Sequence, residues 1–156
     1  MSLAKKILLA LLIVFIAIQF VQPAHNKSER ALPADITKTY NLPENVQTVF
    51  KNACYDCHSN NTHYPWYSNI QPIGWLLAND VRKGKGKLNF SEFGSYSPRK
   101  QRSKLREIQM AMHDGTMPLS TYKLMHRPAR LTKDDKAIIT DWTKKTKDSI
   151  TTKIKQ

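Results

Sequence analysis

The side chains best suited to chemistry lie in one stretch of five residues, Cys54-Tyr55-Asp56-Cys57-His58. It holds the only two cysteines of the chain, three positions apart, and a histidine directly follows the second one. This spacing is the attachment signature of a c-type haem, because each thiol can form a thioether with a vinyl group and the imidazole can reach the iron. The stretch predicts one covalently attached haem c per chain, with Cys54 and Cys57 as attachment points and His58 as an iron ligand.

Three other chemistries use two cysteines at this spacing. A thioredoxin-like redox pair is expected next to a βαβ unit, and the sequence shows no β pattern. A zinc site needs four ligands, and the chain has no second cysteine pair and no suitably spaced histidine pair. A disulfide between Cys54 and Cys57 would close a loop too short to stabilise the fold much. Haem attachment fits the motif better than these three.

The ligand opposite His58 decides what such a haem can do. A methionine there raises the reduction potential and suits electron transfer, whereas an open position allows catalysis or the binding of a small molecule. Met117 follows a glycine turn and precedes a proline, on a loop between two predicted helices. We therefore predict that Met117 is the second iron ligand.

The other candidates for this position are three methionines and three histidines: Met110, Met112, Met125, His63, His113 and His126. Met112 falls in a predicted core stripe. His63 follows His58 too closely along the chain to reach the opposite haem face. His113 at a helix end is expected to interact with the helix dipole. Among these six residues, we keep His126 as the alternative ligand.

The first 24 residues have the features of a membrane-targeting segment. Lys5 and Lys6 precede an unbroken apolar run over residues 7–18. The apolar core of a cleaved signal peptide spans about 7–15 residues and a spanning helix needs about 20, but there is no good small-x-small cleavage site. We predict an uncleaved N-terminal membrane anchor over residues 1–24, with a cleaved signal peptide as the alternative. The two lysines would keep the N-terminus in the cytoplasm and place the remainder on the periplasmic side of the inner membrane.

The chain is strongly basic, with 25 lysines and arginines against 12 acids and a formal net charge of +13. Two lysines precede residue 25, so the rest has 23 bases against 12 acids. A basic excess attracts acidic surfaces, and nucleic acid would be the first partner to consider. An exported domain meets little nucleic acid, however. We predict redox partner proteins with acidic surfaces, or anionic lipid head groups.

Helical signals predict an all-α fold. Residues 25–40 are polar and contain Pro33, and we expect a linker there. From Pro43 a helix carries one apolar stripe at helical spacing, which leads into Cys54. Three more helices are expected, from Pro72 into a glycine- and lysine-rich turn at residues 83–87, from Ser97-Pro98 to about His113, and from a Thr132–Asp135 capping box to about Lys147. The predicted haem domain covers residues 41–147, and residues 148–156 form a basic tail.

Aromatic residues are concentrated in the loop after the motif, over residues 59–72. They could form a wall of the haem site. A proline carbonyl in the same loop could accept a hydrogen bond from the proximal imidazole, since such bonds fix a ligating ring. Pro65 and Pro72 both fit this role, and the sequence does not choose between them.

Three stretches of the sequence also resemble a known family: CYDCHSNNTHYPWYSNIQPIGWLLANDV, LNFSEFGSYSPRKQRSKLREI and GTMPLSTY. They are similar to the haem-binding domain of bacterial membrane-anchored cytochrome c-like proteins, over about residues 30–146. The resemblance implies that Cys54 and Cys57 attach haem and that His58 ligates its iron. It bears on the cofactor rather than on the physiological role, and the assignment of Met117 rests on its position alone.

The predicted function is that of a membrane-tethered, mono-haem electron carrier rather than an enzyme, in a small cytochrome c-like helical domain. The alternative is a haem enzyme or sensor whose sixth iron position is open to peroxide or a diatomic gas. No obvious distal pair of histidine and arginine, of the sort that peroxide cleavage would use, is present.

Overall fold

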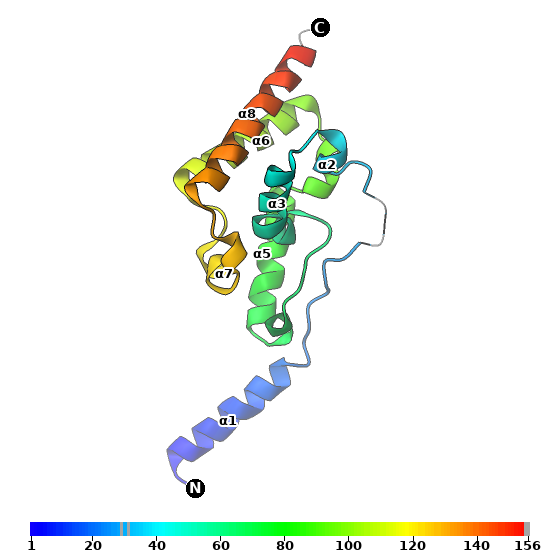
Figure 1. Ribbon diagram of the computed structural model, residues 1–156. Coiled ribbons are helices and arrows are strands. Elements are labelled where there is room, and N and C mark those ends of the chain that lie inside the picture. The colour runs from blue at the N-terminus through cyan, green and yellow to red at the C-terminus, as the bar shows by residue number, and fades with distance from the viewer. Residues whose placement is uncertain (29, 31, 155–156) are drawn as a thin grey trace.

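The computed structural model describes residues 1–28, 30 and 32–154, and within these residues it contains helices and no strand. The all-α prediction is confirmed. In chain order the elements, with η marking a 3-10 helix, are α1 (Leu3–Ile18), α2 (Ile36–Thr39), α3 (Glu44–Ala53), α4 (Tyr55–His58), η1 (Trp66–Asn69), α5 (Ile73–Lys87), η2 (Phe90–Ser95), α6 (Pro98–Asp114), α7 (Ser120–Met125), η3 (Arg127–Ala129) and α8 (Lys133–Ile154). Figure 1 shows α6 and α8 side by side and α3 next to them, with α5 continuing below α3 and α1 projecting from the opposite end.

An aromatic cluster joins α3, η2 and α8 at the centre of the core. The Phe50 ring stacks on Phe90 with centroids 5.0 Å apart, and it meets Trp142 edge-on at 5.7 Å. All three side chains are buried. Aromatic pairs of this kind contribute about 0.5–1.5 kcal/mol beyond the area they bury. Phe50 lies four residues before Cys54, so the Cys54–His58 motif directly follows a residue of the buried aromatic cluster.

The helix predicted from Pro43 is confirmed as α3. Pro43 directly precedes the helix, and Glu44 lies in its first turn, where the helix dipole favours an acidic side chain. The apolar stripe of α3 is buried as expected, and consists of Val46, Val49, Phe50 and Ala53. This buried stripe fixes the rotation of α3 and with it the direction in which Cys54 leaves the helix.

The predicted ends of α6 and the start of α8 are also confirmed. The Ser97 hydroxyl accepts a hydrogen bond from the Lys100 amide at 3.4 Å, and Gly115 ends α6 in the left-handed region at φ 65°. At the start of α8, Thr132 and Asp135 form a capping box: Asp135 N donates to Thr132 Oγ1 at 3.0 Å, and Thr132 N donates to Asp135 Oδ2 at 2.8 Å.

Thr132→Ala is expected to lower the free energy of unfolding by about 1 kcal/mol, because the Asp135 amide loses its hydroxyl acceptor. Urea unfolding followed by circular dichroism measures the change. The matched control is Thr140→Ala, an exposed position inside the same helix, where alanine is the better helix former. An equal loss of stability in both variants would contradict a stabilising role of the Thr132 hydroxyl at the start of α8.

Helix α5 is longer than predicted, because it continues through residues 83–87 to Lys87. The two glycines in this stretch suggested a turn, but both lie inside the helix. A Cβ on Gly84 would stand 2.5 Å from the carbonyl oxygen of Cys57. This glycine therefore allows α5 to approach the haem motif closely, and the tertiary contact outweighs the weak helix propensity of glycine.

The C-terminal region also differs from the prediction of a basic tail after Lys147. Helix α8 extends to Ile154, and the side chain of Ile150 is buried in the core. Residues 148–156 contain only two apolar residues, Ile150 and Ile154, so their sequence gives little periodic signal. Residues 155–156 of the expected tail lie outside the described residues.

Residues 25–40, expected to be a linker, contact the domain at several of the positions that the structure describes. Ile36 in α2 is fully buried in the core. The Asn26 amide donates from Nδ2 to the Ser59 carbonyl at 2.9 Å, and its Oδ1 accepts from Lys85 Nζ at 2.6 Å. The polar side chains of this segment thus form hydrogen bonds with the domain.

The N-terminal hydrophobic helix expected within residues 1–24 is present as α1, but the prediction that it spans a membrane is not met. Its 16 residues correspond to about 24 Å at 1.5 Å per residue, whereas the apolar part of a bilayer is about 30 Å thick. No helix among the described residues is both long and apolar enough to cross a membrane. The chain after α1 is bound to the domain, since Trp75 Nε1 donates to the Val21 carbonyl at 2.8 Å.

Candidate haem site

The two thiols and the imidazole of the motif are held on a single helical turn. Cys54 N donates to the Phe50 carbonyl at 2.9 Å and so ends α3, and α4 then begins directly at Tyr55. The Cys54 carbonyl accepts from Cys57 N at 3.2 Å and from His58 N at 2.9 Å. This turn brings Cys57 and His58 back beside Cys54, as attachment of one porphyrin to both cysteines requires.

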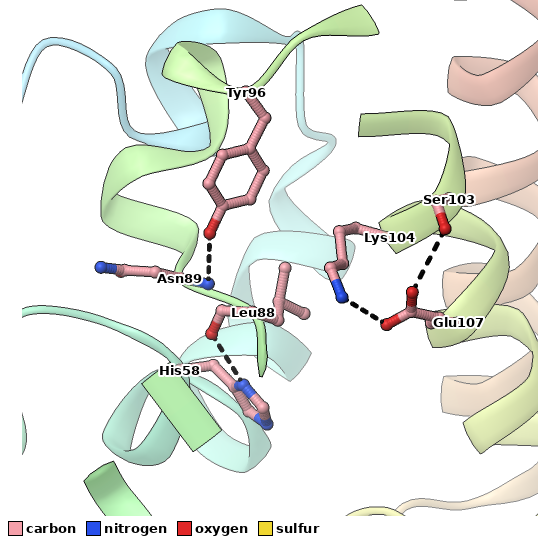
Figure 2. A network of polar contacts seen from close by, with 7 residues as sticks. All are labelled: His58, Leu88, Asn89, Tyr96, Ser103, Lys104 and Glu107. Atoms are coloured by element: carbon pink, nitrogen blue, oxygen red, sulfur yellow. Dashed lines mark hydrogen bonds and ion pairs between the residues drawn. The ribbon is translucent and has the colours of Figure 1, made fainter. Parts of the chain in front are cut away.

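The orientation of His58 is fixed by a backbone carbonyl. Its Nδ1 lies 3.0 Å from the oxygen of Leu88 (Figure 2). Because a carbonyl can only accept, Nδ1 carries the proton and Nε2 keeps its lone pair. The neighbouring Asn89 N donates to Tyr96 Oη at 3.1 Å, which holds the accepting segment in place (Figure 2). In histidines that ligate a metal through one ring nitrogen, the other nitrogen typically donates its proton to a carbonyl or carboxylate in this way.

The source of this carbonyl was predicted wrongly. Pro65 and Pro72 were expected to supply it, but the acceptor is Leu88, the residue that follows α5. The unexpected length of α5 explains the difference. The helix runs past the haem motif and delivers its C-terminal end, rather than the loop before it, to the imidazole.

The protonation of His58 also suits a ligand. Its pKa is lowered, chiefly because burial disfavours the charged ring, while the hydrogen bond to Leu88 opposes this shift in part. A lowered pKa keeps the imidazole neutral at neutral pH. Neutral imidazole is the form that binds a metal.

The environment of the cysteines disfavours redox chemistry of the thioredoxin type. Both are free thiols. Burial is the main cause that raises the pKa of Cys54 to about 12 and that of Cys57 to about 11, with nearby negative charge adding to the shift. Redox-active cysteines have lowered pKa values instead. Among the described residues, no group of three or more His, Cys, Asp or Glu side chains is placed to hold a metal ion, so a zinc site is not supported there either.

Several large apolar side chains are exposed to solvent, where an apolar cofactor could cover them. Ile73, Leu77 and Gly84 share one side of α5, because they are spaced four and seven residues apart, and Gly84 faces Cys57. Several large apolar side chains of α5, η1 and α7 are exposed: Trp66, Ile73, Leu76, Leu124 and Met125. Exposed apolar patches mark sites that something covers, and the apolar faces of a porphyrin held at Cys54 and Cys57 could cover side chains of this kind. The residues present therefore fit the group.

The candidates for the second iron ligand fall in different environments. Met117 lies on the loop between α6 and α7, half-buried against the core, and its role as a ligand stays a prediction. Met112 is buried in the core, as predicted, and Met110 is exposed. His113 is exposed and pairs with Asp114, its Nδ1 2.8 Å from Oδ1, so it lies in solvent.

His126, the alternative ligand, belongs to a cluster that sequence reasoning missed. Its ring stacks on Tyr122 with centroids 4.0 Å apart, and Tyr67 Oη lies 3.3 Å from Nε2. Tyr122 Oη donates to Asp56 Oδ2 at 2.6 Å. The cluster links α7 and η1 to the turn that carries the cysteines. No local pattern signals it, because its members lie up to 70 positions apart.

The fold and the site define an all-helical protein in which paired thiols, an oriented imidazole and an exposed apolar surface fit a haem. Comparison with protein families agrees: the model of a family described as a haem-binding domain matches residues 13–145. The chain belongs to this family, and it is a haem-binding protein. No curated protein and no solved structure was found to match.

Proposed function

We propose that the protein is a c-type cytochrome that transfers single electrons. Cys54 and Cys57 would hold one haem covalently, with His58 and Met117 as the two axial ligands. The observation that carries this proposal is the bond from His58 Nδ1 to the Leu88 carbonyl at 3.0 Å. It directs Nε2 away from the backbone, on the same turn as both thiols.

Each residue has a distinct task in this proposal. The haem supplies the one-electron chemistry. The two cysteines prevent its loss, His58 fixes one axial position, and a methionine on the other side favours the reduced state and excludes other ligands. The core cluster around Phe50 keeps the attachment turn rigid, which limits the rearrangement that accompanies a change of charge.

The N-terminal segment would direct the chain out of the cytoplasm, and α1 would then associate with the membrane without spanning it. In α1 no residue is buried, and its apolar side chains face outward, so lipid would cover surface that water does not favour. The domain would then lie on the periplasmic side of the inner membrane. Its basic excess of 23 bases over 12 acids beyond residue 24 would attract redox partners with acidic surfaces.

Carbon monoxide binding separates this proposal from an enzyme or sensor with an open iron site. We expect the reduced holoprotein to bind carbon monoxide slowly, because Met117 must first leave the iron. The reaction is followed by rapid mixing and absorbance. Rapid binding would contradict the electron carrier and favour the open site.

Met117→Ala is expected to abolish the methionine–iron charge-transfer band of the oxidised protein, because the variant lacks the thioether sulfur. The absorption spectrum of the purified oxidised holoprotein measures this. Met110→Ala is the matched control, since Met110 is an exposed methionine of α6 and its loss should leave the band intact. An unchanged spectrum in Met117→Ala would remove Met117 from the site.

A further inference from the structure

Asp56 lies between the two cysteines of the motif, and its carboxylate is held from two directions. Tyr122 Oη donates to Oδ2 at 2.6 Å, and the backbone amide of His63 donates to Oδ1 at 2.9 Å. Hydrogen bonds to a charged carboxylate are the stronger class of protein hydrogen bond. Tyr122 belongs to α7 and lies 66 positions further along the chain. The bond therefore ties α7 to the turn that carries the thiols.

The half-buried Tyr122 ring also stacks on a neighbouring ring. It stacks on His126 with an interplanar angle of 14°, and the His126 Nδ1 lies 3.2 Å from the Tyr122 carbonyl. Burial and the bond to Asp56 raise the pKa of Tyr122. The phenol therefore keeps its proton at neutral pH and remains a hydrogen-bond donor to Asp56.

The position of this contact matters because of what precedes α7. Met117 and Pro118 lie on the short loop between Gly115, where α6 ends, and Ser120, where α7 begins. Tyr122 is in the first turn of α7. One end of the loop is thus fixed by the long helix α6, and the other end is fixed by the bond between Tyr122 and Asp56.

We propose that Tyr122 and Asp56 are positioning residues that hold the Met117 loop against the haem face opposite His58. This inference rests on the proposed function, in which Met117 binds the iron. The haem-attachment turn would then set the position of both axial ligands, one directly through His58 and the other through Asp56 and α7. Access of outside ligands to the iron would then depend on the bond between Tyr122 and Asp56.

Tyr122→Phe tests the proposal in the holoprotein, because it removes the hydroxyl and keeps the ring. We expect carbon monoxide to bind the reduced variant about tenfold faster, equivalent to about 1.4 kcal/mol. Hydrogen exchange at the backbone amides of α7 should also become faster. Asp56→Asn keeps an acceptor for the hydroxyl and should show a smaller change than Asp56→Ala in both measurements.

Tyr67→Phe is the matched control. It removes a hydroxyl from the same cluster, but one whose contact with His126, at 3.3–3.4 Å, does not reach Asp56. Both readouts should stay near those of the unchanged protein. Equal effects of Tyr67→Phe and Tyr122→Phe would overturn the proposal, as would a Tyr122→Phe protein that is less stable but has unchanged carbon monoxide binding and α7 exchange.

The outcomes also separate this proposal from the proposed function. If Met117→Ala leaves the spectrum unchanged, the assignment of the second ligand fails. Faster exchange in α7 and faster carbon monoxide binding in Tyr122→Phe would then still show that Asp56 and Tyr122 control access to the iron. If Met117→Ala abolishes the band but Tyr122→Phe changes neither readout, the positioning role alone fails.

Discussion

Replacing both Cys54 and Cys57 by serine is expected to leave no haem on the polypeptide after denaturation. In the proposed cytochrome, two thioethers are the covalent links, and the bonds from iron to His58 and Met117 break when the chain unfolds. Haem staining after denaturing electrophoresis, together with the mass of the intact chain, measures the loss. The expected change is complete, because serine forms no thioether.

Variants with one cysteine replaced, and a variant that lacks the proposed iron ligand Met117, provide the controls for this experiment. Cys54→Ser and Cys57→Ser each leave one thiol, so either should keep haem through one thioether. Met117→Ala removes a ligand but no attachment point, and its haem should remain on the denatured chain. Haem that is absent from the denatured unchanged protein would contradict covalent attachment, although the family's haem binding would stand.

The sequence could predict the long helices and the chemical motif because both have local signals. The stripe of α3, the cap at Ser97 and the capping box at Thr132 each involve residues within one or two helical turns. Side chains three or four positions apart meet on the surface of any helix, so their interactions can be inferred without knowing the rest of the fold. The motif at Cys54 is local for the same reason, since one helical turn brings its three functional side chains together.

Features that depend on distant contacts could not be predicted in this way. Gly84 and Gly86 suggested the end of α5, yet Gly84 permits the approach to Cys57 that keeps the helix in place. The carbonyl for His58 was sought in the prolines of the nearest loop, but Leu88 supplies it from 30 positions away.

Single buried side chains in polar stretches account for the remaining differences. Ile36 and Ile150 are each surrounded in sequence by polar residues, and each is buried in the core. Burying an aliphatic side chain of this size stabilises a fold by about 1.5–3 kcal/mol. One such residue is enough to attach a segment, but it does not create a periodic pattern. The expected linker and tail were polar in composition and yet contribute to the domain.

The contact between α5 and the turn that carries Cys57 leads to a further prediction, in which two glycines of one helix respond in opposite ways to the same change. In Gly84→Ala the new Cβ would stand 2.5 Å from the Cys57 carbonyl oxygen and 3.1 Å from its carbon. Because both are backbone atoms of the attachment turn, α5 must move away from α4. We expect a loss of about 1–3 kcal/mol in the free energy of unfolding, as for other overpacked sites. The displacement would also carry Leu88 away from His58 and alter the absorption spectrum of the haem.

Gly86→Ala is the matched control, since no atom lies within 4 Å of a Cβ at this position. Alanine is favoured over glycine inside a helix by roughly 0.5–1 kcal/mol, so this variant should unfold at a higher urea concentration and keep the spectrum unchanged. Urea unfolding of both holoproteins measures the contrast. If the two variants shift the unfolding midpoint in the same direction, α5 does not approach Cys57 closely, and the position of the carbonyl that orients His58 has another cause.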